Sequence, residues 1–252
     1  MTGQITKELT FVTCASNLGV LSERLLTSPC LLSGKYPLSV FFNATSAAYG
    51  FNAAMLAASE TADLSQPVVS WLVWVHQDVF LPQGWDTRFN QALDDALLKF
   101  PKLSVVGAYG VAGSGADSRR AGRVLDRGKL LHESTPLPCL VDSLDELLFA
   151  VRIDAGLRLD PALGFDFYAT DLVLQAQAKG WQCAVVDAYC EHWSGTPSGG
   201  DVSTAIVERV QASANVFESK WSTRLPVTTP CFPIDRAGSV ASFIAAHVIR
   251  VP

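Results

Sequence analysis

The chain has 252 residues, of which 49% are hydrophobic and 17% charged, and this composition suits one α/β domain with a sizeable core. It excludes global disorder, which needs low hydropathy and high charge. The formal net charge of −5 argues against a nucleic-acid partner, because extended nucleic-acid surfaces need clustered Lys and Arg side chains. A single nucleotide, which needs only a metal ion and a few donors, is compatible with this charge.

The sequence also gives no signal for a membrane or for secretion. Its most apolar runs, Val68–Val75 and Val240–Ile249, are shorter than the roughly 20 residues of a membrane helix. Charged and polar residues interrupt the N-terminal region where a signal peptide would lie. The six cysteines form no CxxC pair, which is typical of reduced, mostly buried thiols. These features predict a cytoplasmic protein with no integral membrane segment.

The first part of the chain alternates strands with a helix. Residues 9–14 and 38–42 are short β-rich runs, and each ends in a polar turn, as strands do when they open into ligand-facing loops. The stretch 46–59 is rich in Ala and Leu and predicts a helix, although Gly50 within it lowers helix propensity. The continuous apolar run 68–75 is typical of a central strand buried on both faces.

A helix over residues 86–100 and a buried strand over 103–108 follow. Four glycines between Gly107 and Gly115 then open a charged stretch that reaches about Glu133. Such composition is typical of loops, so we expect a long mobile loop here. Its four arginines between residues 119 and 127 would either close over a diphosphate or form a solvated charged surface.

The stretch 147–151 has two interpretations. Ser143 and Glu146 have the spacing of a capping box, which favours a helix. The unbroken Leu-Leu-Phe-Ala-Val run favours a buried strand instead, and we predict the strand.

Two helices and a strand remain. Residues 171–179 predict a short helix that Gly180 ends, and residues 184–186 predict a strand. Apolar residues three and four positions apart between Ile206 and Trp221 predict an amphipathic helix that packs on the sheet.

Strands that alternate with helices predict an α/β fold in which helices flank a Rossmann-like sheet with mixed edges. We expect residues 1–225 to form its single domain and residues 226–252 to form a C-terminal extension that packs on it.

Three polar clusters have both a functional and a structural interpretation. His76-Gln77-Asp78 directly follows the most apolar strand, where a carboxylate can hold Mg²⁺ or Mn²⁺ against a diphosphate; a solvated turn is the commoner role for a single Asp. Asp171 at a helix start fits a general base or a residue that stabilises the helix dipole. His192 lies in a polar loop that suits a ligand, although single histidines are usually structural.

The order of these clusters resembles a known family. Residues 71–85, Trp-Leu-Val-Trp-Val-His-Gln-Asp-Val-Phe-Leu-Pro-Gln-Gly-Trp, resemble the metal-motif region of family 2-like glycosyltransferases with the GT-A fold. They are most similar to the group typified by a streptomycin-biosynthesis protein domain, where His-Gln-Asp replaces Asp-X-Asp. The other segments that resemble this family are residues 43–58, 164–171, 184–195 and 217–221.

The resemblance implies an inverting transferase that moves a sugar from a nucleotide-diphosphate sugar (UDP-, GDP- or dTDP-linked) to a hydroxyl of a glycan or small-molecule acceptor. It implies that Asp78 and His192 hold a Mn²⁺ or Mg²⁺ ion and that Asp171 is the general base. The residues it implies in donor binding are Thr13, Ala15, Asn17, Asn43, His76, Gln77 and Asp145.

Two positions depart from the family pattern. His76 stands where the first acidic residue of the metal motif is expected, and Thr170 where the acidic neighbour of the base is expected. Both departures leave open a non-catalytic module that binds a nucleotide sugar or a glycan. A nucleotidyltransferase is a further alternative, but it would need a Gly- and Lys-rich phosphate loop, which residues 13–22 lack.

Overall fold

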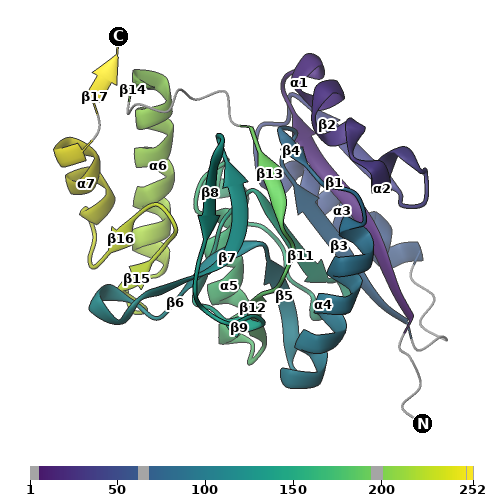
Figure 1. Ribbon diagram of the computed structural model, residues 1–252. Coiled ribbons are helices and arrows are strands. Elements are labelled where there is room, and N and C mark those ends of the chain that lie inside the picture. The colour runs from purple at the N-terminus through teal and green to yellow at the C-terminus, as the bar shows by residue number, and fades with distance from the viewer. Residues whose placement is uncertain (1–5, 62–67, 194–200, 248, 252) are drawn as a thin grey trace.

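The computed structural model is built around a seven-stranded mixed sheet (Figure 1). Its strands are β1 (Thr6–Ala15), β2 (Leu38–Phe42), β3 (Val68–Val75), β5 (Leu103–Gly107), β9 (Cys139–Leu140), β11 (Leu148–Arg152) and β12 (Gln182–Val185). They lie in the order β2-β1-β3-β11-β5-β12-β9. β1 is parallel to β2 and β3, whereas β11 is antiparallel to β3 and β5. The structure describes residues 6–61, 68–193, 201–247 and 249–251.

Helices cover both faces of this sheet. Side chains along β1 alternate between two cores, with Phe11 in one and Val12 in the other, because successive residues of a strand point to opposite faces. The Phe11 core includes residues of α1 (Leu18–Glu23), α2 (Pro29–Leu32) and α4 (Trp85–Lys99), and the Val12 core includes residues of α3 (Ala47–Thr61) and α5 (Tyr168–Ala178). The 3-10 helices are η1 (Leu25–Thr27), η2 (Gly115–Asp117), η3 (Ile153–Ala155) and η4 (Pro161–Leu163).

A second sheet lies beside the first, with the order β10-β6-β7-β13-β4 and with β8 paired to β7. Its strands are β4 (Val79–Phe80), β6 (Tyr109–Ala112), β7 (Arg119–Asp126), β8 (Lys129–His132), β10 (Ser143–Leu144) and β13 (Cys190–His192). β6, β7 and β8 are antiparallel neighbours over the stretch that we expected to be a mobile loop, so that prediction is wrong. At Gly122, where φ is +116°, a Cβ would lie 2.2 Å from the Ala108 carbonyl oxygen. The glycine therefore permits a close approach of two strands.

The C-terminal part contains α6 (Thr204–Lys220), α7 (Ser239–His247), the hairpin of β15 (Val227–Thr228) and β16 (Pro233–Ile234), and the pair β14 (Asp201–Ser203) and β17 (Ile249–Val251). Apolar residues of α6, α7, β15 and β16 form a third core with Leu163, Phe167 and Leu174. In Figure 1, α6 and α7 stand at the side of the molecule opposite α1 and α2. The buried carboxylate of Glu218 on α6 accepts hydrogen bonds from the backbone N–H groups of Gly238 and Val240. Whether residues 226–252 act as a separate extension stays a prediction.

The predicted single-domain α/β fold with a mixed sheet flanked by helices is confirmed. Residues 148–152 are the strand β11, which decides the ambiguous 147–151 stretch against a helix. The predicted helix at 171 begins earlier, at Tyr168, and this places Asp171 inside its first turn. All six cysteines are free, and three of them are buried. Within the described ranges, no helix is both long enough and apolar enough to cross a membrane.

Candidate metal centre and two adjoining cavities

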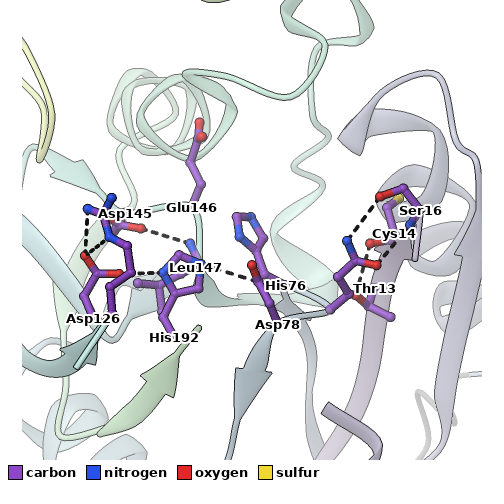
Figure 2. Close-up of polar contacts among 12 residues, drawn as sticks. Thr13, Cys14, Ser16, His76, Asp78, Asp126, Asp145, Glu146, Leu147 and His192 are labelled. Atoms are coloured by element: carbon purple, nitrogen blue, oxygen red, sulfur yellow. Dashed lines mark hydrogen bonds and ion pairs between the residues drawn. The ribbon is translucent and has the colours of Figure 1, made fainter. Parts of the chain in front are cut away.

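Three potential metal ligands come together beyond the end of β3. β3 ends at Val75, and β13 pairs with β4 so that His192 lies opposite Val79. This pairing brings His192 beside Asp78. One ligand atom each from His76, Asp78 and His192 lies within 4.8 Å of the others (Figure 2). The Asp78 and His192 side chains are 19% and 16% exposed, so the cluster is accessible from solvent.

A carboxylate outside the cluster orients His192. β13 also pairs with β7, and Asp126 lies opposite His192 in that register. Asp126 Oδ1 is 2.8 Å from His192 Nδ1, and His192 Nε2 is 3.4 Å from Asp78 Oδ1. Metal-binding histidines typically have such a carboxylate on their second ring nitrogen, because it fixes the tautomer and the ring orientation. The other histidine, His76, is held through Nε2, which lies 2.8 Å from the Tyr168 hydroxyl.

The protein shifts the pKa values of the two imidazoles in opposite directions. Burial lowers the pKa of His76 to about 4, which keeps it neutral at pH 7. Burial also acts to lower the pKa of His192, but hydrogen bonds to Asp78 and Asp126 outweigh it and raise this pKa to about 9. Burial acts to raise the pKa of Asp78, and the hydrogen bond from His192 outweighs it, so the pKa lies below its usual value. Asp78 is therefore ionised beside one neutral and one protonated imidazole, and a metal ion that binds His192 Nε2 would displace the proton of that nitrogen.

A polar cavity of about 370 Å³ opens on one side of the cluster, at the carboxyl ends of β1, β2 and β3. Gln77 fixes its rim, because its Oε1 accepts hydrogen bonds from the backbone N–H groups of Ser16 and Asn17, both 3.0 Å away. Arg209 from α6 supplies a positive charge to the lining. The carboxyl ends of strands in open α/β sheets are where ligands commonly bind.

An apolar cavity of about 340 Å³ opens on the other side. Its walls include Phe167 before α5, Val210 of α6 and Phe232 beside β16. His76 lines both cavities. Asp166 lines the apolar cavity and accepts two hydrogen bonds from Arg209 of the polar one, at 2.9 and 3.0 Å. This ion pair and His76 therefore connect the two cavities.

The structure brings together most of the predicted site residues. The ones that line the polar cavity are Ala15, Asn43, His76, Gln77 and Asp78. Asp145 lines the apolar cavity and accepts a hydrogen bond from the Leu147 N–H. Thr13 is fully buried within β1, and the Asn17 side chain caps α1; neither lines either cavity.

Asp171, the predicted general base, is placed outside both cavities. Its side chain is 0% exposed. One oxygen lies 2.7 Å from both Trp221 Nε1 and Lys220 Nζ, and the other accepts a hydrogen bond from Gln175. Both oxygens are therefore occupied and the side chain lines neither cavity, so the structure does not support Asp171 as a base, which needs access to the acceptor hydroxyl; its catalytic role stays a prediction. The neighbouring Thr170 lines the apolar cavity instead.

Sequence analysis missed several residues of the site. Asp126 lies in the stretch mistaken for a loop, so its position opposite His192 could not be anticipated. Asp166 and Tyr168 lie within the segment 164–171, in which only Asp171 was predicted to act. Arg209 carries no motif signal, and Glu146 was considered only as part of a possible capping box with Ser143. The fold brings α6 and the segment before β11 to the cleft.

The four arginines between residues 119 and 127 do not line either cavity. The Arg123 guanidinium lies 4.5 Å from the centre of the Tyr189 ring, and Arg127 binds Asp126. Their role as a solvated, charged surface fits this placement better than closure over a diphosphate.

Neither a protein-family model nor the sequence of a curated protein matches this chain. Among solved structures, it is similar to A197 from STIV, with a TM-score of 0.43 and 12% identity over 72% of this chain and 82% of that one. It is also similar to the inositol-1-phosphate CTP transferase from T. maritima, with a TM-score of 0.33 and 12% identity over 83% of this chain and 96% of that one. Both TM-scores are too low to carry an argument about function.

Proposed function

We propose that this chain is a metal-dependent glycosyltransferase that moves a sugar from a nucleotide-diphosphate sugar to an acceptor hydroxyl with inversion. The observation that carries the proposal is the position of the His76, Asp78 and His192 cluster between a polar and an apolar cavity. The resemblance of residues 71–85 to the metal-motif region of family 2-like glycosyltransferases supports it. So does the position of the polar cavity at the strand ends.

The residues of the cluster fit a divalent ion. Two imidazoles and one carboxylate within 4.8 Å form a mixed nitrogen and oxygen donor set, and Asp126 provides the outer carboxylate that such a histidine ligand needs. Imidazole suits transition metals, whereas Mg²⁺ prefers oxygen ligands; this donor set therefore favours Mn²⁺ over Mg²⁺. When bound, the ion would stabilise the negative charge that develops on the departing diphosphate.

The chain's own residues account for donor placement. Gln77 holds the loop after β1 in place through the Ser16 and Asn17 N–H groups. Arg209 faces the polar cavity while its partner Asp166 faces the apolar one. The diphosphate of a donor in the polar cavity would therefore meet a positive charge next to the metal cluster. The acceptor would approach from the opposite side, as inversion requires.

A thermal-shift screen of UDP, GDP, dTDP and CMP with and without Mn²⁺ tests the proposal. A ligand that binds only the folded state raises its stability by about 2.7 kcal/mol at 100 times the dissociation constant. We expect a nucleoside diphosphate to stabilise the protein only with Mn²⁺, and Asp78→Ala to abolish that shift. Asp95→Ala, which removes an exposed carboxylate from α4, is the control. An unchanged Mn²⁺-dependent shift in Asp78→Ala would contradict the metal role.

A non-catalytic nucleotide-sugar-binding module is a second candidate, and the sealed environment of Asp171 favours it. Incubation with nucleotide sugars in water separates the two, because an active site hydrolyses its donor slowly. Mn²⁺-dependent binding without any hydrolysis would support the binding module.

A further inference from the structure

We infer that the apolar cavity binds the acceptor, a molecule that carries its hydroxyl on an apolar body, and that Glu146 accepts the proton of that hydroxyl. The inference rests on the proposed function and specifies its acceptor class and its base. It replaces Asp171 in the role of proton acceptor.

The first observation is an unpaired carboxylate oxygen. Glu146 Oε1 is buried and has no hydrogen-bond partner among the described residues, while Glu146 lines the apolar cavity. Buried polar atoms are nearly always paired, so this exception leaves an acceptor that a hydroxyl donor of a ligand can reach. Figure 2 shows the Glu146 side chain extending away from Asp126 and His192. Its free oxygen is therefore not part of the metal cluster.

The second observation is the chemistry of the cavity walls. The contributions of α6, α7 and the segment around β16 are mainly apolar, including Ile206, Val210, Phe232 and Ile244. Apolar walls bind apolar surface, and a few polar groups then fix the orientation of a ligand. Glu146 and Asp166 are both hydrogen-bond acceptors when ionised. A ligand with an apolar body and a hydroxyl donor matches this lining, and a second anion does not.

The third observation is the location of the cavity relative to the donor side. His76 lines both cavities, so a ligand in the apolar one ends next to the proposed metal cluster. The Asp166–Arg209 pair links the two spaces. An acceptor hydroxyl held by Glu146 would therefore face a donor sugar that enters from the polar cavity.

The step balances without a further reactant. The acceptor O–H bond breaks, and its proton goes to Glu146 Oε1. The acceptor oxygen forms a bond to the anomeric carbon as the bond from that carbon to the diphosphate oxygen breaks. The nucleoside diphosphate leaves with the electron pair of that bond.

The environment of Glu146 supports this role. Burial, and then repulsion from Asp166 and Asp145, raises the pKa of Glu146 well above its usual value, and the N–H groups of Ala169 and Tyr168 oppose the shift only in part. In its ionised form, a carboxylate with a raised pKa is a stronger proton acceptor, and catalytic carboxylates are commonly tuned in this direction.

Calorimetric binding of straight-chain alcohols from butan-1-ol to octan-1-ol tests the cavity. Each buried methylene contributes about 0.8 kcal/mol, so the affinity should rise about fourfold per carbon. Val210→Trp should fill the cavity and abolish binding, and Glu208→Trp, an exposed position on the same helix, is the control. UDP with Mn²⁺ should not compete with the alcohols. Affinity that does not depend on chain length, or that survives Val210→Trp, would overturn the inference, as would competition with the nucleotide.

The hydroxyl contact is tested with octyl methyl ether, which lacks the O–H donor. A hydrogen bond to a charged group corresponds to roughly a tenfold or greater preference for the alcohol. Glu146→Leu should remove this preference, and Glu146→Gln should keep most of it because the amide oxygen still accepts. An equal preference in the parent and in Glu146→Leu would overturn the assignment of Glu146.

Proton transfer is tested with a nucleotide sugar that the parent hydrolyses, together with octan-1-ol. We expect the parent to form an octyl glycoside and Glu146→Gln to form it about 10²–10⁴-fold more slowly while most of the affinity for the alcohol is kept. An undiminished rate in Glu146→Gln, or no glycoside from the parent, would overturn the inference. The proposed function fails differently, through loss of any Mn²⁺-dependent nucleotide binding.

Discussion

Asp126 shows how one residue outside the cleft can control a metal ligand. Its carboxylate binds His192 Nδ1 and leaves Nε2 toward Asp78. Asp126→Asn keeps the size of the side chain but weakens the hold on the imidazole tautomer. We expect a 10–100-fold loss of Mn²⁺ affinity, measured by calorimetry. Glu191→Gln, on the same strand as His192, removes one negative charge but leaves the contact between His192 and Asp126 intact, and is the control. Equal losses of Mn²⁺ affinity in both variants would show that Asp126 acts only through its charge.

Asp171 is the residue at which family resemblance and geometry disagree. Its buried carboxylate joins α5 to the end of α6 through Trp221 and Lys220. Asp171→Asn leaves Lys220 with Asp160 alone and turns one buried acceptor oxygen into an NH₂ donor, so the free energy of unfolding should fall by about 1–3 kcal/mol. Urea denaturation measures this change. Mn²⁺-dependent nucleotide binding should persist well below the melting temperature, and a stable variant that has lost turnover would restore Asp171 as the base.

At the scale of the element, α3 depends on a glycine that helix propensity alone disfavours. A Cβ at Gly50 would lie 2.6 Å from Cys14 Sγ and 3.0 Å from the Phe41 ring, so the glycine lets α3 pack directly on β1 and β2. Gly50→Ala gains about 1 kcal/mol of helix propensity, but overpacking costs about 1–3 kcal/mol. We expect a lower melting temperature. Adding Cys14→Ala removes the Sγ atom and should recover part of the lost stability. If a double-mutant cycle of the two substitutions shows no coupling energy, the clash with Cys14 is not the cause.

Elements with regular periodicity could be predicted, and elements formed by pairing across the chain could not. The apolar run 68–75 matches β3 to the residue, because a strand buried on both faces is apolar at nearly every position, here with Ser70 as the exception. The strands β6, β7 and β8 were missed because glycines and exposed arginines hide their pairing. The same limit applies to the site. Asp78 could be found in the polar turn after an apolar run, and His192 in a polar segment that was expected to be a loop and folds as the strand β13. Asp126, Glu146 and Arg209 come to the cleft only through tertiary contacts.

At the scale of the molecule, different elements of the fold form the walls of the two cavities. The polar cavity lies on strand ends of the central sheet, whereas the apolar cavity takes much of its wall from α6 and from residues 229–244. Glu218 holds that segment, since its carboxylate accepts from Gly238 and Val240 at the start of α7. A change that loosens this segment should therefore weaken binding in the apolar cavity and leave nucleotide binding in the polar cavity unchanged.

Glu218→Gln tests whether the C-terminal segment holds the apolar cavity alone. The amide can accept one of the two hydrogen bonds, but its NH₂ group then faces an N–H donor, so about 1–3 kcal/mol of local stability should be lost. Hydrogen exchange should accelerate across residues 227–247 and stay unchanged in β1 and β3. Affinity for octan-1-ol should fall while the Mn²⁺-dependent shift by the nucleoside diphosphate stays as in the parent. Glu208→Gln, on the exposed face of α6, should change neither. Equal losses of both ligands in Glu218→Gln would mean that the C-terminal segment supports the whole cleft, because the donor side would then depend on α7 as much as the acceptor side does.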